Sequence, residues 1–255
     1  MLPRLKQAGK ILTSGVLFTL LGVGGCLYTL FVHPVLVLLP GGVELRQRRV
    51  QRAVRLFFKL FVIGLSKSGI LRVETSGFPS PGALAGSIVV ANHPSYLDIV
   101  ILIALLPEAV CVVKEGVWHN PFFGRIVQAA GFITNEEPGT VLEHCRKALA
   151  MGRTLVIFPE GSRTRPGQAL KFHRGAAHLA LRTGAPVLPF SIQVDPPLLA
   201  KGDRWYHISV PTCVFKIASG PRLSGVTPEA DDTLFLRSAR TLTRAMEEHY
   251  LKSMT

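Results

Sequence analysis

The sequence predicts an α/β fold, a mixed sheet flanked by helices, preceded by an N-terminal membrane-associated helical segment. After residue 76, short apolar runs alternate with helix-like stretches, which is typical of a layered α/β domain. Near the N-terminus, residues 11–32 carry no charge. The chain of 255 residues is long enough for one such domain and an N-terminal appendage. We therefore expect a helical hairpin with a basic amphipathic helix over residues 1–70 and an α/β domain over 71–255.

The charge of the chain is concentrated at its apolar end. The formal net charge is +13, the pI is about 10.1, and 48% of the residues are hydrophobic. Nine basic residues and only one acid lie in the first 60 residues. A nucleic-acid-binding protein would instead show Lys and Arg gathered with aromatics on a polar face or a binding motif. The pattern favours anionic membrane lipids as partners and no nucleic acid.

The uncharged run of 22 residues, 11–32, is long enough to cross a hydrocarbon core of about 30 Å. Four glycines interrupt the run and two prolines follow it: Gly15, Gly22, Gly24, Gly25, Pro34 and Pro40. Both flanks are basic, so the distribution of positive charge gives no orientation. A re-entrant or interfacial hairpin fits this symmetry better than a simple span. A cleaved signal peptide fits poorly, because the apolar run continues beyond Cys26.

The stretch 43–70 mixes arginines with valines and phenylalanines at helical spacing. It reads as a basic amphipathic helix on anionic headgroups, or as an ordinary surface helix. Further on, strands are expected at residues 87–91, 110–113, 154–158, 187–192 and 214–218. Helices are expected at 140–151 with a capping box at Thr140, at 172–183, and from 227–228 onward.

The first chemical cluster follows a buried-strand run, at Asn92-His93-Pro94-Ser95-Tyr96-Leu97-Asp98. Proline holds His93 extended, and Ser95 can cap a helix that starts at Tyr96. A strand, a turn and a helix can bring His93 and Asp98 together, whereas one continuous helix would not. The carboxylate would fix the imidazole tautomer and leave the second nitrogen as a base for an attacking alcohol. The alternative is a capping box beside an ordinary strand-end histidine.

The second cluster, Phe158-Pro159-Glu160-Gly161-Ser162-Arg163-Thr164-Arg165, also leaves an apolar strand. Backbone N–H groups of the turn, together with Ser162, Arg163, Arg165 and Lys171, predict a phosphate-binding site. Glu160 fits such a basic turn only if it accepts hydrogen bonds from the loop or from a substrate hydroxyl. The alternative is a solvated basic loop.

These two clusters, with Gly131-Phe132-Ile133 between them and Pro186-Val187-Leu188-Pro189 after them, resemble the four motifs of the glycerolipid acyltransferase family, which includes 1-acylglycerol-3-phosphate acyltransferases. The resemblance covers residues 70–221. It implies an O-acyltransferase that uses acyl-CoA or acyl carrier protein as co-substrate and holds no bound cofactor. It also implies that His93 and Asp98 are catalytic and that Glu160, Gly161 and Arg163 hold a lysolipid acceptor. Transfer would be direct, at the cytosolic side of an inner membrane.

The sequence departs from the family at its second motif. Many members that bind a phosphorylated glycerol have an arginine a few residues after the motif's glycine, but Gly131 is followed by Phe132, Ile133, Thr134, Asn135 and Glu136. The acceptor therefore stays open between 1-acylglycerol-3-phosphate, another lysophospholipid and a lyso-ornithine or specialised lipid.

Two other classes of protein compete with an acyltransferase. A metal-dependent phosphoesterase would use His93, Asp98 and Glu160 as ligands, but the chain lacks a dense second set of His and Asp near them. The four scattered cysteines form no zinc pattern either, so we expect no metal site. A membrane-binding module without catalysis would have no use for the His93 and Asp98 pair.

Overall fold

The computed structural model describes residues 2–135, 138–165, 168, 170–223 and 232–254. Its elements follow in chain order: α1 (Leu2–Leu27), the π-helix η1 (Tyr28–Val32), α2 (His33–Leu38), α3 (Val43–Lys67), β1 (Leu71–Ser76), α4 (Pro81–Leu84), β2 (Ile88–Ala91), α5 (Asp98–Leu105), β3 (Ala109–Val113), α6 (Glu115–Trp118), α7 (Gly124–Ala129), β4 (Ile133–Thr134), α8 (Pro138–Ala150), β5 (Thr154–Ile157), α9 (Gly175–Thr183), β6 (Val187–Asp195), β7 (Cys213–Ser219) and α10 (Asp232–Met254).

The seven strands form one mixed sheet in the order β1-β7-β6-β2-β5-β3-β4. The α/β fold class is therefore confirmed. Strands β2, β3, β4, β5 and β6 are parallel to one another, and β7 joins β6 antiparallel. Because β2 pairs directly with β5 and β6, the segments that leave these three strands emerge at one edge of the sheet, where ligands bind in open α/β sheets.

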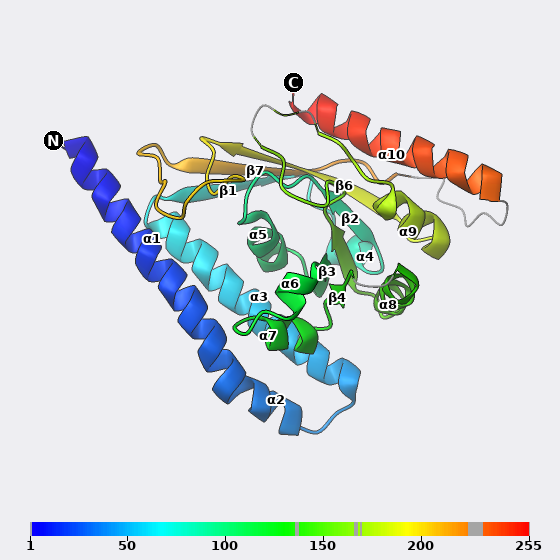
Figure 1. The fold of residues 1–255 in the computed structure, drawn as a ribbon, viewed down its shortest axis with the longest axis horizontal. Coiled ribbons are helices and arrows are strands. Elements are labelled where there is room, and N and C mark those ends of the chain that lie inside the picture. The colour runs from blue at the N-terminus through cyan, green and yellow to red at the C-terminus, as the bar shows by residue number, and fades with distance from the viewer. Residues whose placement is uncertain (1, 136–137, 166–167, 169, 224–231, 255) are drawn as a thin grey trace.

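Helices cover both faces of the sheet (Figure 1). Residues Val89 and Ala91 of β2 pack with α3 and α5 on one face. The alternate residues Ile88 and Val90 pack with α8, α9 and α10 on the other. A strand that is apolar at every position is the expected consequence of burial on both sides.

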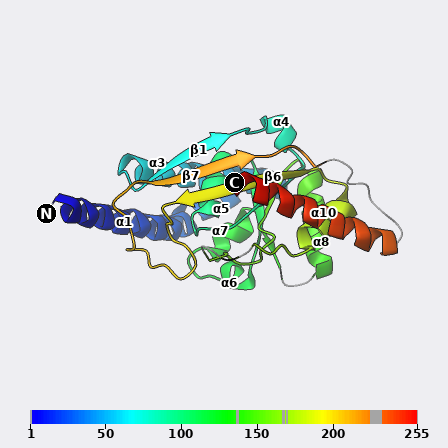
Figure 2. The same cartoon turned by 90° about the horizontal axis from the view of Figure 1, so that it is seen from above.

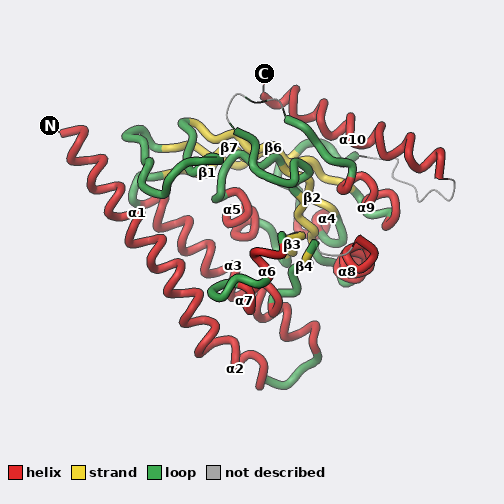
Figure 3. The backbone as a smooth tube through the Cα atoms, in the orientation of Figure 1, coloured by secondary structure: helices red, strands yellow, loops and turns green. Residues whose placement is uncertain are grey.

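The N-terminal helices form a long hairpin along one side of the domain (Figures 1 and 3). Whether this hairpin is re-entrant or interfacial in a membrane stays a prediction. The glycines do not break the helix, which continues through η1 and α2 until a loop at residues 39–42 reverses the chain. Gly24 instead provides room for a partner, since a Cβ there would lie 2.5 Å from the Phe57 ring. Helix α3 thus packs closely against α1.

One apolar stripe of α3 faces the protein, while Leu56 and Leu60 on the same helix are exposed, so contact of α3 with headgroups stays a prediction. Val50, Val54 and Phe61 are buried in the same core as Ile101 of α5. The continuous helix Leu5–Leu38 is long and apolar enough to cross a membrane, and only 6% of its most apolar window is buried.

Several helices and strands begin at other residues than the sequence predicts. Strand β1 was missed, and α8 begins at Pro138, so Thr140 lies within the first turn and is no cap. Helix α9 starts at Gly175, later than predicted, because the Phe172 and His173 N–H groups donate to Glu247 and to the Pro159 carbonyl. The predicted start of the last helix, 227–228, lies outside the described residues. Its expected packing stripe of Phe235, Ala239, Leu242 and Met246 is buried.

Candidate active site

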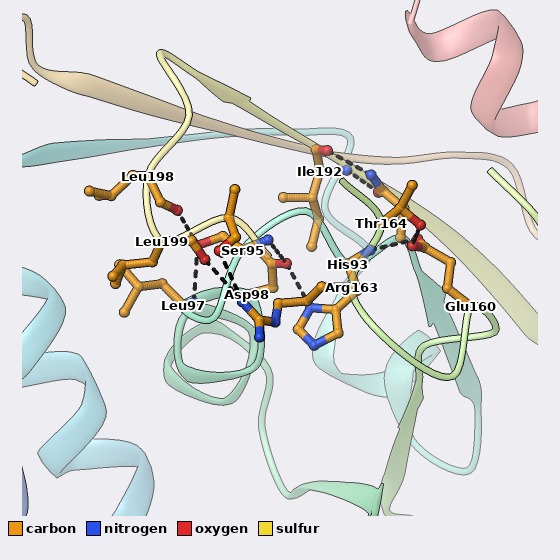
Figure 4. Close-up of polar contacts among 12 residues, drawn as sticks. His93, Ser95, Leu97, Asp98, Glu160, Arg163, Thr164, Ile192, Leu198 and Leu199 are labelled. Atoms are coloured by element: carbon orange, nitrogen blue, oxygen red, sulfur yellow. Dashed lines mark hydrogen bonds and ion pairs between the residues drawn. The ribbon is translucent and has the colours of Figure 1, made fainter. Parts of the chain in front are cut away.

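The segment after β2 brings His93 and Asp98 into direct contact (Figure 4). The distance from His93 Nδ1 to Asp98 Oδ2 is 2.8 Å, and the same oxygen accepts the Ser95 backbone N–H at 2.7 Å. The proximity predicted for this pair is therefore confirmed. The other ring nitrogen points away from Asp98 in Figure 4. An imidazole held through Nδ1 can accept a proton at Nε2.

The local backbone differs from the prediction in one respect. Tyr96 does not start the helix, because its N–H donates to the Leu199 carbonyl at 3.1 Å, and α5 begins at Asp98. The Ser95 hydroxyl donates to the Leu198 carbonyl at 2.7 Å and accepts the Leu97 N–H at 3.2 Å. The turn that carries Asp98 is thus fixed by the segment following β6.

Burial dominates the electrostatics of Asp98. Its side chain is 0% exposed, whereas the His93 side chain is 19% exposed. Burial raises the pKa of Asp98 from 3.8 to about 6, and the hydrogen bonds from His93 and Ser95 oppose this rise. Asp98 is therefore ionised at neutral pH. Its second oxygen, Oδ1, has no hydrogen-bond partner among the described residues.

Phe158 orients the imidazole from the neighbouring strand. Its ring stacks on His93 with a centroid distance of 4.1 Å and an interplanar angle of 19°. The stack and the Asp98 bond together limit rotation of the His93 ring about both side-chain torsions. The strand end at β5 therefore supplies a positioning surface that the sequence did not reveal.

Glu160 links the two clusters. Its Oε1 accepts the His93 backbone N–H at 2.8 Å, and its Oε2 accepts the Thr164 hydroxyl. The expectation that Glu160 bonds within the loop is confirmed. Gly161 has a positive φ of 64°, and its N–H donates to the Phe158 carbonyl at 3.1 Å. The predicted backbone phosphate cradle is therefore wrong at Gly161, because that donor is already used.

Cationic side chains lie beside the turn after β5. The Arg163 guanidinium lies 3.2 Å from the Tyr96 ring centroid and donates to the Ala200 carbonyl at 3.1 Å. The Lys201 ammonium donates to the Ser162 hydroxyl at 3.2 Å. Arg165 and Lys171 are exposed, and the described contacts tie neither of them to the pair.

Besides Phe158, two residues beside the site were not predicted from sequence, Asn92 and Lys201. The Asn92 amide donates to the Ile192 carbonyl at 2.9 Å and accepts the Ile192 N–H at 2.7 Å. It holds the end of β2 against β6, and its place before His93 was the only available signal. Lys201 lies far along the chain in the β6–β7 loop, where no local pattern marked it.

In the part of the chain that the structure describes, no group of three or more His, Cys, Asp or Glu side chains is close enough to hold a metal ion. His93, Asp98 and Glu160 do not converge on one point: Glu160 reaches the backbone of His93, not its ring.

The Acyltransferase family model matches residues 74–193, a range that holds both clusters. The chain is therefore similar in sequence to acyltransferases that act on glycerolipids. It is 29% identical over 213 residues to the 1-acyl-sn-glycerol-3-phosphate acyltransferase of Helicobacter pylori. The aligned region covers 80% of this chain and 81% of that protein. It is 27% identical over 189 residues to the enzyme of the same name from Cocos nucifera, with 68% of this chain and 58% of that protein covered.

The fold of this chain is also found in a solved structure. The crystal structure of the 1-acyl-sn-glycerophosphate (LPA) acyltransferase PlsC from Thermotoga maritima superposes with a TM-score of 0.66 at 22% identity, over 95% of this chain and 97% of that one. The N-terminal helices and the α/β domain therefore form a fold that this chain has in common with that protein.

Proposed function

We propose that this acyltransferase moves a fatty acyl group from an acyl thioester to the free hydroxyl of a lysophospholipid, with 1-acylglycerol-3-phosphate as the acceptor and phosphatidic acid as the product. The observation that carries the proposal is the buried Asp98 bonded to His93 Nδ1, beside the cations Arg163 and Lys201. The names of the relatives support the same acceptor.

In the proposed reaction, His93 Nε2 removes the proton of the acceptor hydroxyl. The resulting oxygen nucleophile attacks the thioester carbonyl, and the carbon–sulfur bond breaks as the tetrahedral intermediate collapses. The proton on His93 then passes to the departing thiolate. Asp98 stabilises the transient imidazolium through Nδ1, and no acyl group becomes attached to the protein. The donor is acyl-CoA or acyl carrier protein.

Headgroup recognition falls to the cations beside the turn after β5. Arg163 is partly exposed; it lies over the Tyr96 ring and donates to the Ala200 carbonyl. Lys201 donates to the Ser162 hydroxyl. A fixed guanidinium and a nearby ammonium are suited to a phosphate monoester. Lys201 supplies a charge that the arginine-free segment after Gly131 lacks. Exposed Arg165 and Lys171 add long-range attraction.

The hairpin supports attachment to one leaflet. Helix α3 lies against α1 at several depths, including an edge contact between Phe18 and Phe61 with centroids 5.5 Å apart. Arg55 of α3 donates to the Leu105 carbonyl at 3.1 Å, which fixes α3 to the α/β domain. If α1 crossed a bilayer, α3 would enter the hydrocarbon core beside it and carry the polar Arg55 contact with it. We therefore propose that α1 lies in the cytosolic leaflet of the inner membrane, with residues 71–255 in the cytosol.

The test supplies purified protein with labelled acyl-CoA or acyl carrier protein and with lysophosphatidate, lysophosphatidylglycerol or a lyso-ornithine lipid. A preparation made without the gene gives the background from host enzymes. Lysophosphatidate should be acylated fastest, and labelled phosphatidic acid should form in the presence of a chelator. A faster reaction with a different lysolipid would overturn the acceptor. Loss of turnover with the chelator would favour a metal-dependent enzyme, and no turnover at all would favour a binding module.

A further inference from the structure

The β6–β7 loop, residues 196–212, lies beside the N-terminal half of α1 in two perpendicular views (Figures 1 and 2). Three contacts fix it there. The Gln7 amide donates to the Ile208 carbonyl at 3.1 Å, and the Lys10 ammonium donates to the Val210 carbonyl at 2.9 Å. The Trp205 ring lies against Gly15, where a Cβ would stand 3.2 Å from it. The loop is therefore fastened to the helix that carries the apolar surface.

Trp205 and α1 enclose an open groove with a volume of about 590 Å³. Seven α1 residues between Ala8 and Leu20 line it together with Trp205, and Thr19 is the only hydroxyl among them. Leu12 is 72% exposed and Trp205 is 48% exposed. The groove thus presents an apolar wall and a half-exposed indole to the surroundings.

The surface around the groove indicates what covers it. The exposed apolar residues of its wall continue along the same helix to Leu27 and Leu30, within the stretch that is long enough to span a membrane. Two exposed cations lie next to groove residues in the sequence: Lys6 is close to Ala8, and Arg204 precedes Trp205. An indole at a polar boundary, an apolar floor and flanking cations are the features of a protein surface that binds anionic lipid.

The other end of the same loop holds the catalytic turn. Its Leu198 and Leu199 carbonyls accept the Ser95 hydroxyl and the Tyr96 N–H, and its Ala200 carbonyl accepts Arg163. A displacement of Trp205 by lipid would therefore act on a segment that is bonded directly to the residues around Asp98.

We infer that residues 196–212 form a second membrane-contact element, in which Trp205 and α1 receive one acyl chain of an anionic phospholipid leaflet. The contact sets the depth of the catalytic turn relative to the lipid surface. This inference rests on the proposed reaction at a membrane and adds a specific contact to it.

The two tryptophans of the chain, Trp118 and Trp205, allow a direct test. The wild type and Trp205→Phe are transferred from detergent into vesicles of phosphatidylglycerol and phosphatidylethanolamine, with or without brominated acyl chains. Subtracting the variant's fluorescence isolates Trp205. The Trp205 emission should shift to shorter wavelength in vesicles and be quenched by the brominated lipid. A single-tryptophan Trp118→Phe variant repeats the measurement without subtraction.

Sedimentation of the same samples separates the possible failures. Protein that sediments with vesicles while Trp205 remains unquenched would overturn the second contact and leave the membrane-bound reaction intact. Protein that does not sediment would overturn both.

A functional arm uses Trp205→Glu, with Leu236→Glu on the exposed face of α10 as the matched control. Trp205→Glu should lower the rate of acyl transfer to vesicle-embedded acceptor by about fivefold or more, because a charge opposes insertion at this boundary. The rate of transfer to detergent-dispersed acceptor should stay within about twofold of the wild type. The control should change neither rate. Equal losses in vesicles and in detergent would contradict a lipid-binding role for Trp205.

Discussion

Asp98 combines complete burial with a single well-satisfied oxygen. Because burial raises its pKa to about 6, the folded protein binds this proton more tightly than the unfolded chain does. Raising the pH from about 4 to about 6 therefore ionises the unfolded chain first and lowers the free energy of unfolding. Above this window, the protein carries the full cost of a buried carboxylate. The buried carboxylate thus lowers the free energy of unfolding, and in return it provides His93 with a negatively charged partner.

Asp98→Asn should separate these two effects. Acyl transfer should fall by about a thousandfold or more, since an amide does not stabilise an imidazolium. The pH dependence of thermal unfolding between about pH 4 and 6 should become flatter, since the titrating group is gone. Steady-state kinetics and unfolding scans in detergent check both results. An unchanged slope would mean that Asp98 has an ordinary pKa, and wild-type turnover would remove it from the mechanism.

Wild-type activity should also rise through about pH 6 as Asp98 loses its proton.

In the proposed reaction, Lys201 binds the anionic headgroup of the acceptor. Lys201→Ala should raise the KM for lysophosphatidate by about threefold to tenfold with little change in kcat, because one exposed phosphate contact is lost. Lys216→Ala, an exposed lysine of β7, is the matched control. A fall in kcat at unchanged KM would assign Lys201 to the chemistry instead.

The sequence was informative about site residues that lie close together along the chain. The spacing of His93 and Asp98 after an apolar strand predicted their contact, which the structure shows. Lys201 and the stack of Phe158 on His93 depend on strand pairing between distant segments, so no local pattern could reveal them. The roles of Ser162, Arg163, Arg165 and Lys171 in acceptor binding stay predictions.

At the scale of elements, the site depends on the pairing of β2 with β5. Val90 stands opposite Ile157, so the segments that start at Ala91 and Phe158 leave the sheet together. Glu160 then bonds the backbone of His93 across this junction. One carboxylate thus fixes the relative position of the two motifs.

Glu160→Ala should lower the free energy of unfolding by about 1–3 kcal/mol, because the His93 N–H would lose its acceptor. It should also lower kcat, since His93 would be less well positioned. Glu160→Gln keeps an acceptor for that N–H and should retain most of the stability. Unfolding measurements on both variants check the difference. A large and equal loss in the two variants would show that the negative charge, rather than the hydrogen bond, is what matters.

Buried elements were easier to predict than edge elements. Strands β2, β3 and β5 have continuous apolar runs, and all three were expected. Strand β1 alternates Leu71 and Val73 with charged residues and lies at the edge of the sheet, so its pattern was weak. The start of α9 was misplaced because contacts with distant residues use the N–H groups of Phe172 and His173.

At the scale of the whole molecule, two long helices pack along one side of the α/β domain. Helix α3 is fastened to the domain by polar contacts, among them the ion pair between Arg48 and Glu108 at 2.6 Å. Helix α1 packs on α3 through small residues. The sequence did not show where the chain reverses direction, because glycine is equally consistent with a break in a helix and with close helix packing.

Gly24→Leu should test this packing. The new side chain would meet the Phe57 ring, separate α1 from α3 and lower the free energy of unfolding by about 1–3 kcal/mol. Gly22→Leu is the matched control, since nothing lies within 4 Å of a Cβ at that position. Thermal unfolding in detergent compares the two variants. Equal stability of both would mean that α1 does not pack on α3 as described.

The measurement that tests the central claim most directly compares acyl transfer by the wild type, His93→Ala and His144→Ala, with labelled acyl thioester and lysophosphatidate. His144 is an exposed histidine of α8, so its removal controls for loss of an imidazole elsewhere. We expect His93→Ala to lower kcat by about a hundredfold to ten-thousandfold and to unfold at the same temperature as the wild type. We expect His144→Ala to keep the activity of the wild type. Wild-type turnover in a folded His93→Ala protein would contradict the role of His93 as the base.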